Sequence, residues 1–249
     1  MARQVTKKRA PRRRSVKGNV AIDEVVYDTI RQAMLGGRLG PGTKLQEPQL
    51  ARLLKVSRER VRKALHRLVH ERWLEAVPNR GTLVPTPSVE ELRELYEVRR
   101  ILEEAIVRRL AKEMGSVASA RRLRAHVAEE RAAVKSGDRG RLFGLSTEFH
   151  ALLADLCGNE QLSRTLRSVL PRSSLHFSLF APPQFDNCAG PHDHGDIVKA
   201  VIAGDAEKAC RLMAEHLDGL VRLLSVRPEP LAHASLDEIF RDASVAKRS

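Results

Sequence analysis

Three histidines in the rear part of the chain have the surroundings expected of metal ligands. His150, His194 and His216 each lie among apolar residues at helical spacing, which predicts that each points into a helical core. Three such residues on separate helices can meet, because antiparallel helices pack their apolar faces together, and imidazole is the commonest ligand of zinc, nickel and similar ions. We therefore expect a divalent-metal site at these residues. The alternative is that each is an ordinary core histidine with its hydrogen bonds satisfied.

A second group of residues could bind nucleic acid. Ser57 is a natural helix N-cap, and Val61 and Leu65 would anchor the following helix through an apolar face. The opposite face is rich in arginine, which binds phosphate and makes bidentate contacts with guanine. A basic face can also be merely solvated. The residues that we predict to contact DNA are Ser57, Arg58, Glu59, Arg60, Arg62 and Lys63, with Arg80 and Gly81 at the tip of a predicted turn.

The charge distribution supports a polyanionic partner for the front of the chain only. Residues 1–85 hold 20 Lys/Arg and 7 Asp/Glu, whereas residues 86–249 hold 24 of each. Such asymmetry is typical of a nucleic-acid-binding domain joined to a neutral domain with another task. Residues 1–20 are basic and cannot bury enough apolar surface to fold alone. We expect a disordered arm there, either solvated or adding phosphate contacts.

The elements that must position the basic face fit a winged helix-turn-helix over residues 21–86. Apolar periodicity predicts a first helix from Ala21 to Gly36, a short second helix around Leu50 to Leu54, and a third helix after Ser57. Two short extended runs flank the turn from Pro78 to Gly81, which predicts a β-hairpin wing. Three helices and a wing in this order are typical of a DNA-binding domain.

The rest of the chain is predicted to be all-helical, which makes the whole fold mainly α. Breakers such as Gly137 and Gly158 separate the helical stretches, and the domain over residues 89–226 reads as an antiparallel helical bundle. Residues 227–249 are expected to be a flexible tail with one helical turn near Leu236. The expected helices are 89–114, 117–136, 139–157, 160–180, 190–203 and 205–226.

Composition bounds the compartment and excludes two classes of protein. The three cysteines form no CxxC pattern, which argues against a disulfide framework and for a reducing environment. No apolar run approaches the roughly 20 residues that span a bilayer. The basic N-terminus has no apolar stretch behind it, so we expect no secretory signal and no membrane partner. A cytoplasmic location is the expectation.

These motifs together resemble the GntR family of bacterial transcription regulators, and the rear of the chain resembles its FadR-like branch with an all-helical FCD domain. The resemblance implies a homodimer on a palindromic double-stranded operator. Where the family usually has Thr-Pro, this chain has Glu59-Arg60, a change that could alter the operator sequence. The residues that carry the likeness include Tyr27–Arg31, Leu39–Leu45, Glu47, Leu50-Ala51, Val56–Arg58, Val61–Leu65 and Pro78–Gly81.

The same resemblance assigns residues to an effector site. His150, His194 and His216 match its three metal-binding histidines, but Ser146 stands where the family pattern has Asp, so metal could be replaced by a metal-free anion pocket. Arg99, Glu103 and Ser146 are the expected effector-binding residues, with Arg99 meeting a small carboxylate. At i, i+4 spacing, Arg99 and Glu103 could instead form a surface salt bridge.

We therefore predict a transcription regulator, a repressor by the commoner family behaviour, controlled by a small carboxylic acid, and not an enzyme. A metalloenzyme built on His194 and His216 is the first alternative, but no general base is evident beside the histidines. A nonspecific nucleic-acid binder is the second, but the chain lacks the aromatic platform of single-strand readers. Asn159 is expected to cap a helix, and His176 and His192 to be structural or surface residues.

Overall fold

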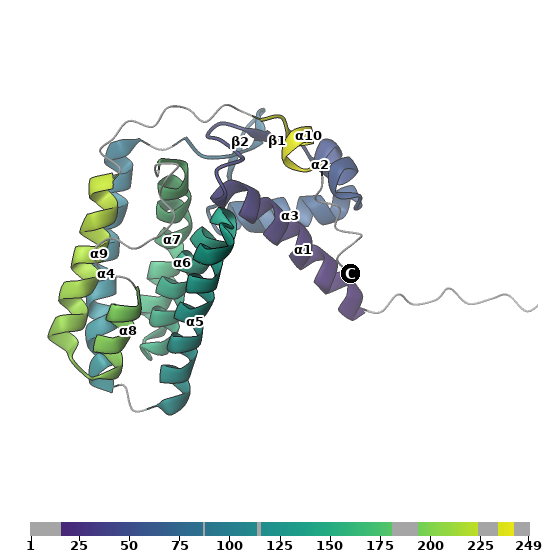
Figure 1. The fold of residues 1–249 in the computed structure, drawn as a ribbon. Coiled ribbons are helices and arrows are strands. Elements are labelled where there is room, and N and C mark those ends of the chain that lie inside the picture. The colour runs from purple at the N-terminus through teal and green to yellow at the C-terminus, as the bar shows by residue number, and fades with distance from the viewer. Residues whose placement is uncertain (1–15, 87, 114–115, 181–193, 224–233, 242–249) are drawn as a thin grey trace, which may run out of the picture.

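A computed structural model describes residues 16–86, 88–113, 116–180, 194–223 and 234–241, and it has two parts that share one hydrophobic core. The first part holds three helices and a small sheet, and the second is a bundle of long helices (Figure 1). The last helix in the chain lies with the first part. The predicted fold class, mainly α with a winged helix-turn-helix before a helical bundle, is confirmed.

The N-terminal part is a winged helix-turn-helix. Its helices are α1 (Val16–Leu35), α2 (Glu47–Leu54) and α3 (Arg58–His70). Strands β2 (Glu75–Val77) and β3 (Gly81–Leu83) form the predicted antiparallel wing, and the turn between them uses positive φ at Asn79 and Gly81. The sheet has a third strand, β1 (Lys44–Leu45), which pairs with the other edge of β3.

Two boundaries differ from the expectation. Helix α1 begins at Val16 and not at Ala21, so the expected border of the basic arm at residue 20 falls inside a helix. Strand β1 was not predicted, because two residues are too short a stretch to show period-two alternation. At its C-terminal end α1 stops as expected, where Gly37 adopts a positive φ.

The helical bundle follows the predicted order closely. It comprises α4 (Val89–Glu113), α5 (Val117–Ser136), α6 (Arg139–Leu156), α7 (Glu160–Phe180), α8 (His194–Ile202) and α9 (Ala206–Leu223). Gly137 ends α5 in the left-handed conformation, and the Asp138 side chain then caps α6. Asn159 caps α7 as predicted, since its Oδ1 accepts from the backbone N–H of Gln161 and Leu162.

Helices α1 and α6 join the two parts through an unusually close contact. A Cβ built on Gly140 would lie 2.9 Å from the backbone oxygen of Gln32, and one on Gly144 would lie 3.2 Å from the Gln32 amide nitrogen. Only glycine allows the backbones to approach so closely. Beside this contact, Arg31 of α1 donates to Glu148 of α6 at 2.9 Å. The winged helix-turn-helix therefore rests on the helix that carries His150.

The end of the chain corrects a prediction. Residues 227–249 were expected to be a flexible tail, but the helical turn predicted near Leu236 is helix α10 (Leu236–Ile239), which is packed and not loose. Its apolar side chains belong to the main core, because they complete the apolar face beside α2. In Figure 1, α10 lies next to α2 and β1, although the whole helical bundle separates it from them in the sequence.

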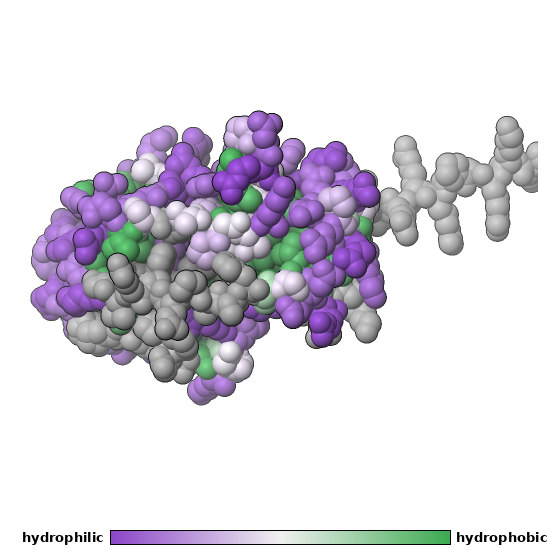
Figure 2. Space-filling model, turned by 90° about the horizontal axis from the view of Figure 1, so that it is seen from above, coloured by the Kyte–Doolittle hydropathy of each residue, from purple (hydrophilic) through white to green (hydrophobic). Residues whose placement is uncertain are grey.

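One face of the molecule is largely polar. Where the view from above is coloured, it is mostly hydrophilic, with small separate hydrophobic patches (Figure 2). Among the described residues, no helix has the length and apolar character needed to cross a membrane.

Candidate functional site

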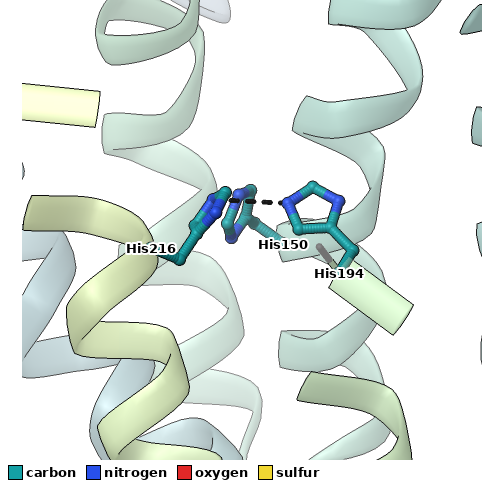
Figure 3. Close-up of side chains that lie close together, drawn as sticks. All are labelled: His150, His194 and His216. Atoms are coloured by element: carbon teal, nitrogen blue, oxygen red, sulfur yellow. Dashed lines mark hydrogen bonds between the residues drawn. The ribbon is translucent and has the colours of Figure 1, made fainter. Parts of the chain in front are cut away.

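Three histidines meet inside the helical bundle, as predicted. His150 of α6, His194 of α8 and His216 of α9 are all buried, and they present ligand nitrogens that lie within 4.8 Å of one another. The Nε2 atoms of His194 and His216 are 3.3 Å apart. Figure 3 shows the three rings turned toward a common point. Each histidine comes from a different helix, and the three rings meet at one place. Isolated core histidines would be separate from one another.

Two carboxylates orient the rings. Nδ1 of His150 donates to Glu103 of α4, and Nδ1 of His194 donates to Glu130 of α5 at 2.8 Å. A hydrogen bond at Nδ1 fixes the tautomer and leaves Nε2 with its lone pair for a ligand. This carboxylate–histidine pairing is the usual outer shell of a protein metal site.

Arg99 completes a buried charged network with Glu103. Its Nε donates to Glu103 at 2.7 Å, and its Nη1 donates to Ser173 of α7 at 3.4 Å. Arg99 is 2% exposed and Glu103 is 1% exposed, so this pair is not a surface salt bridge. A buried ion pair of this kind carries a large desolvation penalty, so stability alone does not account for it. A role in binding a ligand would account for it.

The electrostatics keep Glu103 charged and two histidines neutral. Burial by itself would raise the pKa of Glu103, but Arg99 and His150 outweigh it and lower that pKa to about 2. Burial lowers the pKa of His150 to about 4, and Arg99 adds to this, while Glu103 opposes it. Burial and the neighbouring histidines hold the pKa of His216 well below its usual range. Neutral imidazole is the form that binds metal.

The donor set fits a divalent transition metal. Two ligands at zinc–nitrogen distances of about 2.0–2.1 Å in a tetrahedron are roughly 3.4 Å apart, close to the His194–His216 separation of 3.3 Å. Ser146, one turn before His150 on α6, is buried and brings no carboxylate. Three histidines with an open fourth position make a site that can also take an oxygen ligand from a bound molecule.

The exposed end of α3 forms the candidate DNA surface. Ser57 caps the helix as predicted, accepting from the backbone N–H of Arg60, while Val61 and Leu65 are buried against the core. Arg58 and Lys63 are exposed, as are Glu59 and Arg62 and the wing residues Arg80 and Gly81.

Two of the predicted DNA-contacting arginines have partners within the protein. Arg62 donates to Glu47 of α2 at 3.1 Å while keeping half of its side chain exposed. Arg60 is turned back toward α1, where it forms a short ion pair with Asp23, and its side chain is 21% exposed. A structural role therefore accounts for Arg60, whereas Arg58 and Arg62 lie on the exposed face.

Sequence comparison decides the family. Residues 22–84 match the gntR family of bacterial regulatory proteins, and residues 94–219, about half of the chain, match the FCD domain. This chain belongs to the GntR family, in the branch with an FCD domain.

Relatives of this GntR protein are regulators by name. It is 37% identical over 134 residues to the Nta operon transcriptional regulator of Aminobacter aminovorans, a match that covers 53% of this chain and 62% of the relative. It is 27% identical over 203 residues to the HTH-type transcriptional repressor RspR of Escherichia coli K12, covering 79% of this chain and 86% of that protein. A solved structure of a putative transcriptional regulator GntR from Rhodococcus sp. RHA1 covers 86% of this chain and all of its own, at 26% identity and a TM-score of 0.66.

Three polar residues of this GntR protein were missed from the sequence. Glu130 lies on the apolar stripe of α5 with Leu123 and Val127, and a lone acid on a buried stripe is a usable signal. Ser173, which contacts Arg99, gave no such signal. His66 is exposed on α3 one turn after Arg62, so helical spacing places it on the same exposed side as Arg62.

The remaining predicted histidines fall in two classes. His176 of α7 is fully buried, and neither of its ring nitrogens has a hydrogen-bond partner among the described residues. Burial, followed by Arg172, lowers its pKa to about 3. His192 lies outside the described residues, so its predicted structural or surface role is not addressed.

Proposed function

We propose that this GntR-family protein is a sequence-specific DNA-binding repressor, acting in the cytoplasm as a homodimer, whose grip on DNA is controlled by a small carboxylic acid in the FCD domain. The observation that carries the proposal is the pairing of an exposed basic helix end with a buried polar site of three histidines and an arginine. An enzyme would need a reacting group beside the histidines, and each nearby carboxylate is already paired.

The DNA half of the proposal rests on α3. An N-terminal helix end carrying Arg58 and Arg62 suits the major groove, where arginine reads guanine. Arg80 and Gly81 at the wing would follow the backbone or the adjacent groove. Glu47 holds one edge of the Arg62 guanidinium, which reduces the side-chain entropy lost when the other edge meets a base.

The effector half rests on the charge balance of the buried site. Glu103 and Glu130 contribute two negative charges and Arg99 one positive charge, so the site with neutral imidazoles has a net charge of −1. A divalent ion would bring this to +1, which favours an anion. His150, His194 and His216 would hold the ion, and bound metal would supply a Lewis acid able to accept a carboxylate oxygen. Arg99 would then bind the second oxygen.

The homodimer is supported by an apolar strip on α4. Val98 is 43% exposed and Ile101 is 66% exposed, and their i, i+3 spacing places them side by side. Large exposed apolar residues in a row often mark a protein–protein contact. In a dimer, an effector can change the spacing of the two recognition helices only if it binds one arrangement better than the other.

The test is selection of bound fragments from a random DNA library by the purified full chain. Fluorescence anisotropy then measures the affinity for the selected sequence. We expect a palindromic site that binds at least about a thousandfold more tightly than scrambled DNA. Addition of zinc and a panel of small carboxylic acids should weaken this binding for at least one acid. An Arg99→Met variant should bind the same DNA and lose the acid response.

Two outcomes would contradict the proposal. Equal affinity for selected and scrambled DNA would favour the nonspecific binder. Specific binding that no acid of the panel alters, with or without zinc, would support the DNA half and reject control by a small acid.

A further inference from the structure

We propose that residues 235–241, here called the C-terminal clip, hold the winged helix-turn-helix in one orientation by packing against the rear of α2 and the turn after α1. The clip lies outside both family matches, which end at residues 84 and 219. Its role follows from packing and chain connectivity, and only its effect on DNA rests on the proposed function.

The clip is a folded element and not a chance contact. Ser235 and Glu238 form a capping box, in which the Ser235 side chain accepts from the Glu238 N–H and the Glu238 carboxylate accepts from the Ser235 N–H. This satisfies two of the amides at the helix start without help from another part of the protein. The turn is therefore encoded in its own sequence and can dock as a unit.

Apolar burial supplies most of the docking energy. Phe240 is fully buried, and Leu236 and Ile239 are each only 7% exposed. These three side chains belong to the same continuous core as the helix-turn-helix. Burying an aromatic and two branched side chains outweighs the exposed ion pairs nearby, which contribute little.

Polar contacts fix where the clip docks. Asp237 accepts from Gln49 at 2.7 Å and from Arg52 at 2.9 Å, both on α2. The backbone oxygen of Ile239 accepts from Arg38 at 3.2 Å. The clip thus contacts the helix-turn-helix at α2 and at the turn after α1. These polar contacts restrict the apolar side chains of the clip to one docked position.

The docking face is turned away from DNA. Glu47, which holds Arg62 of the recognition helix, lies on one side of α2. Gln49 and Arg52 lie about 160° and about 140° around the helix axis from Glu47. The clip therefore covers the rear of α2 and leaves the exposed end of α3 open, so it braces the domain and does not compete with DNA.

The chain connections between the two parts limit how the helix-turn-helix can be oriented. One chain connection between the two parts runs from β3 to α4, and the second runs from α9, the helix of His216, to the clip. A domain held by two chain connections and by the α1–α6 contact has far fewer orientations than a domain on one linker.

The test is hydrogen exchange of the full chain, comparing wild type with Phe240→Ala and the milder Asp237→Ala. We expect α2 amides to exchange about tenfold faster or more in Phe240→Ala and less so in Asp237→Ala, with α4 and α9 unchanged. Asp196→Ala, which removes a surface ion pair of α8, is the matched control and should leave α2 unaffected. Wild-type exchange of α2 in both clip variants would overturn the proposal.

Binding to the selected DNA provides the second readout. Both clip variants should lose affinity several-fold with an unchanged salt slope, because no phosphate contact is removed. Full affinity together with fast exchange in α2 would overturn the orienting role. If wild type selects no DNA, the proposed function fails, and the exchange result still decides whether the clip braces α2.

Discussion

Nε2 of His194 and Nε2 of His216 lie 3.3 Å apart, and both rings are buried. Nδ1 of His194 faces the Glu130 carboxylate at 2.8 Å, and a neutral ring with its proton there has a lone pair at Nε2. His216 has no partner at Nδ1 among the described residues, and it must place its proton on Nε2 if the two rings are to hydrogen-bond. A cation between the rings would remove this constraint, because both nitrogens could then present lone pairs.

Metal content is the first prediction. Protein purified without chelator or histidine tag should contain about one zinc or nickel ion per chain, because the ligand nitrogens of three buried histidines converge. His194→Ala should contain little metal by mass spectrometry of the elements. His66→Ala, which changes an exposed histidine of α3, should retain it. Absence of metal from wild type would leave Arg99 and the histidines as a metal-free anion site.

Restoring a carboxylate at Ser146 should strengthen metal binding. Ser146→Asp places an acid one turn from His150 in a buried position. Without metal, the added charge should lower the melting temperature, since an unpaired buried carboxylate is costly. With zinc, the melting temperature should rise above that of zinc-loaded wild type, and zinc affinity should increase about tenfold or more. Ser174→Asp, on α7, is a buried serine control that should show only the loss. A zinc response no larger than that of wild type would place position 146 away from the ion.

The sequence predicted the elements well and the site in part. Apolar periodicity locates a long helix reliably, which is why α4 to α7 fall within a residue or so of expectation. It also placed His150, His194 and His216 on inward faces. It could not pair Glu130 with His194 or Ser173 with Arg99, because such contacts depend on how distant helices pack. Strand β1 exists only because β3 lies beside it.

Arg58 and Arg60 should respond differently to removal. Arg58→Ala should cost about 1–3 kcal/mol on the selected DNA and relax its sequence preference, because an exposed arginine at this end of α3 can read guanine. Arg60→Ala should mainly lower the melting temperature, since Arg60 pairs with Asp23 of α1. Anisotropy on selected and scrambled DNA, with thermal unfolding of both variants, checks this. Unchanged discrimination in Arg58→Ala would contradict the assigned role.

The buried His176 should make the protein sensitive to acid. Its pKa in the folded protein is about 3, below the ordinary value of 6.5, so only the unfolded chain takes up this proton as the pH falls between the two values. Stability from this group is therefore complete above pH 6.5 and is lost at about 1.4 kcal/mol per pH unit below it. In urea unfolding between pH 7 and pH 5, His176→Leu should lose less stability than wild type. Ser174→Ala, on the same helix, should keep the wild-type dependence. Equal pH dependence in all three proteins would mean that His176 is not held neutral by burial.

The α1–α6 contact can be tested by adding one carbon. Gly140→Ala should destabilise the protein, because its Cβ would lie 2.9 Å from the backbone of Gln32. Gly219→Ala on α9 meets nothing closer than 3.9 Å and should stabilise it by about 0.5–1 kcal/mol, the usual gain of alanine over glycine in a helix. Denaturant unfolding of the two variants measures whether each substitution lowers or raises the free energy of unfolding. A gain in Gly140→Ala would show that α1 can shift without cost.

A cut at the connection that follows the wing is one way to exchange recognition modules between regulators. In this chain such a cut would separate the helix-turn-helix from Leu236, Ile239 and Phe240, which follow the helical bundle in the sequence and yet belong to the same core as the helix-turn-helix. A hybrid made in that way would expose an apolar patch on α2 and would be prone to aggregate. The transferable module is discontinuous, and a working hybrid of this regulator must carry both pieces.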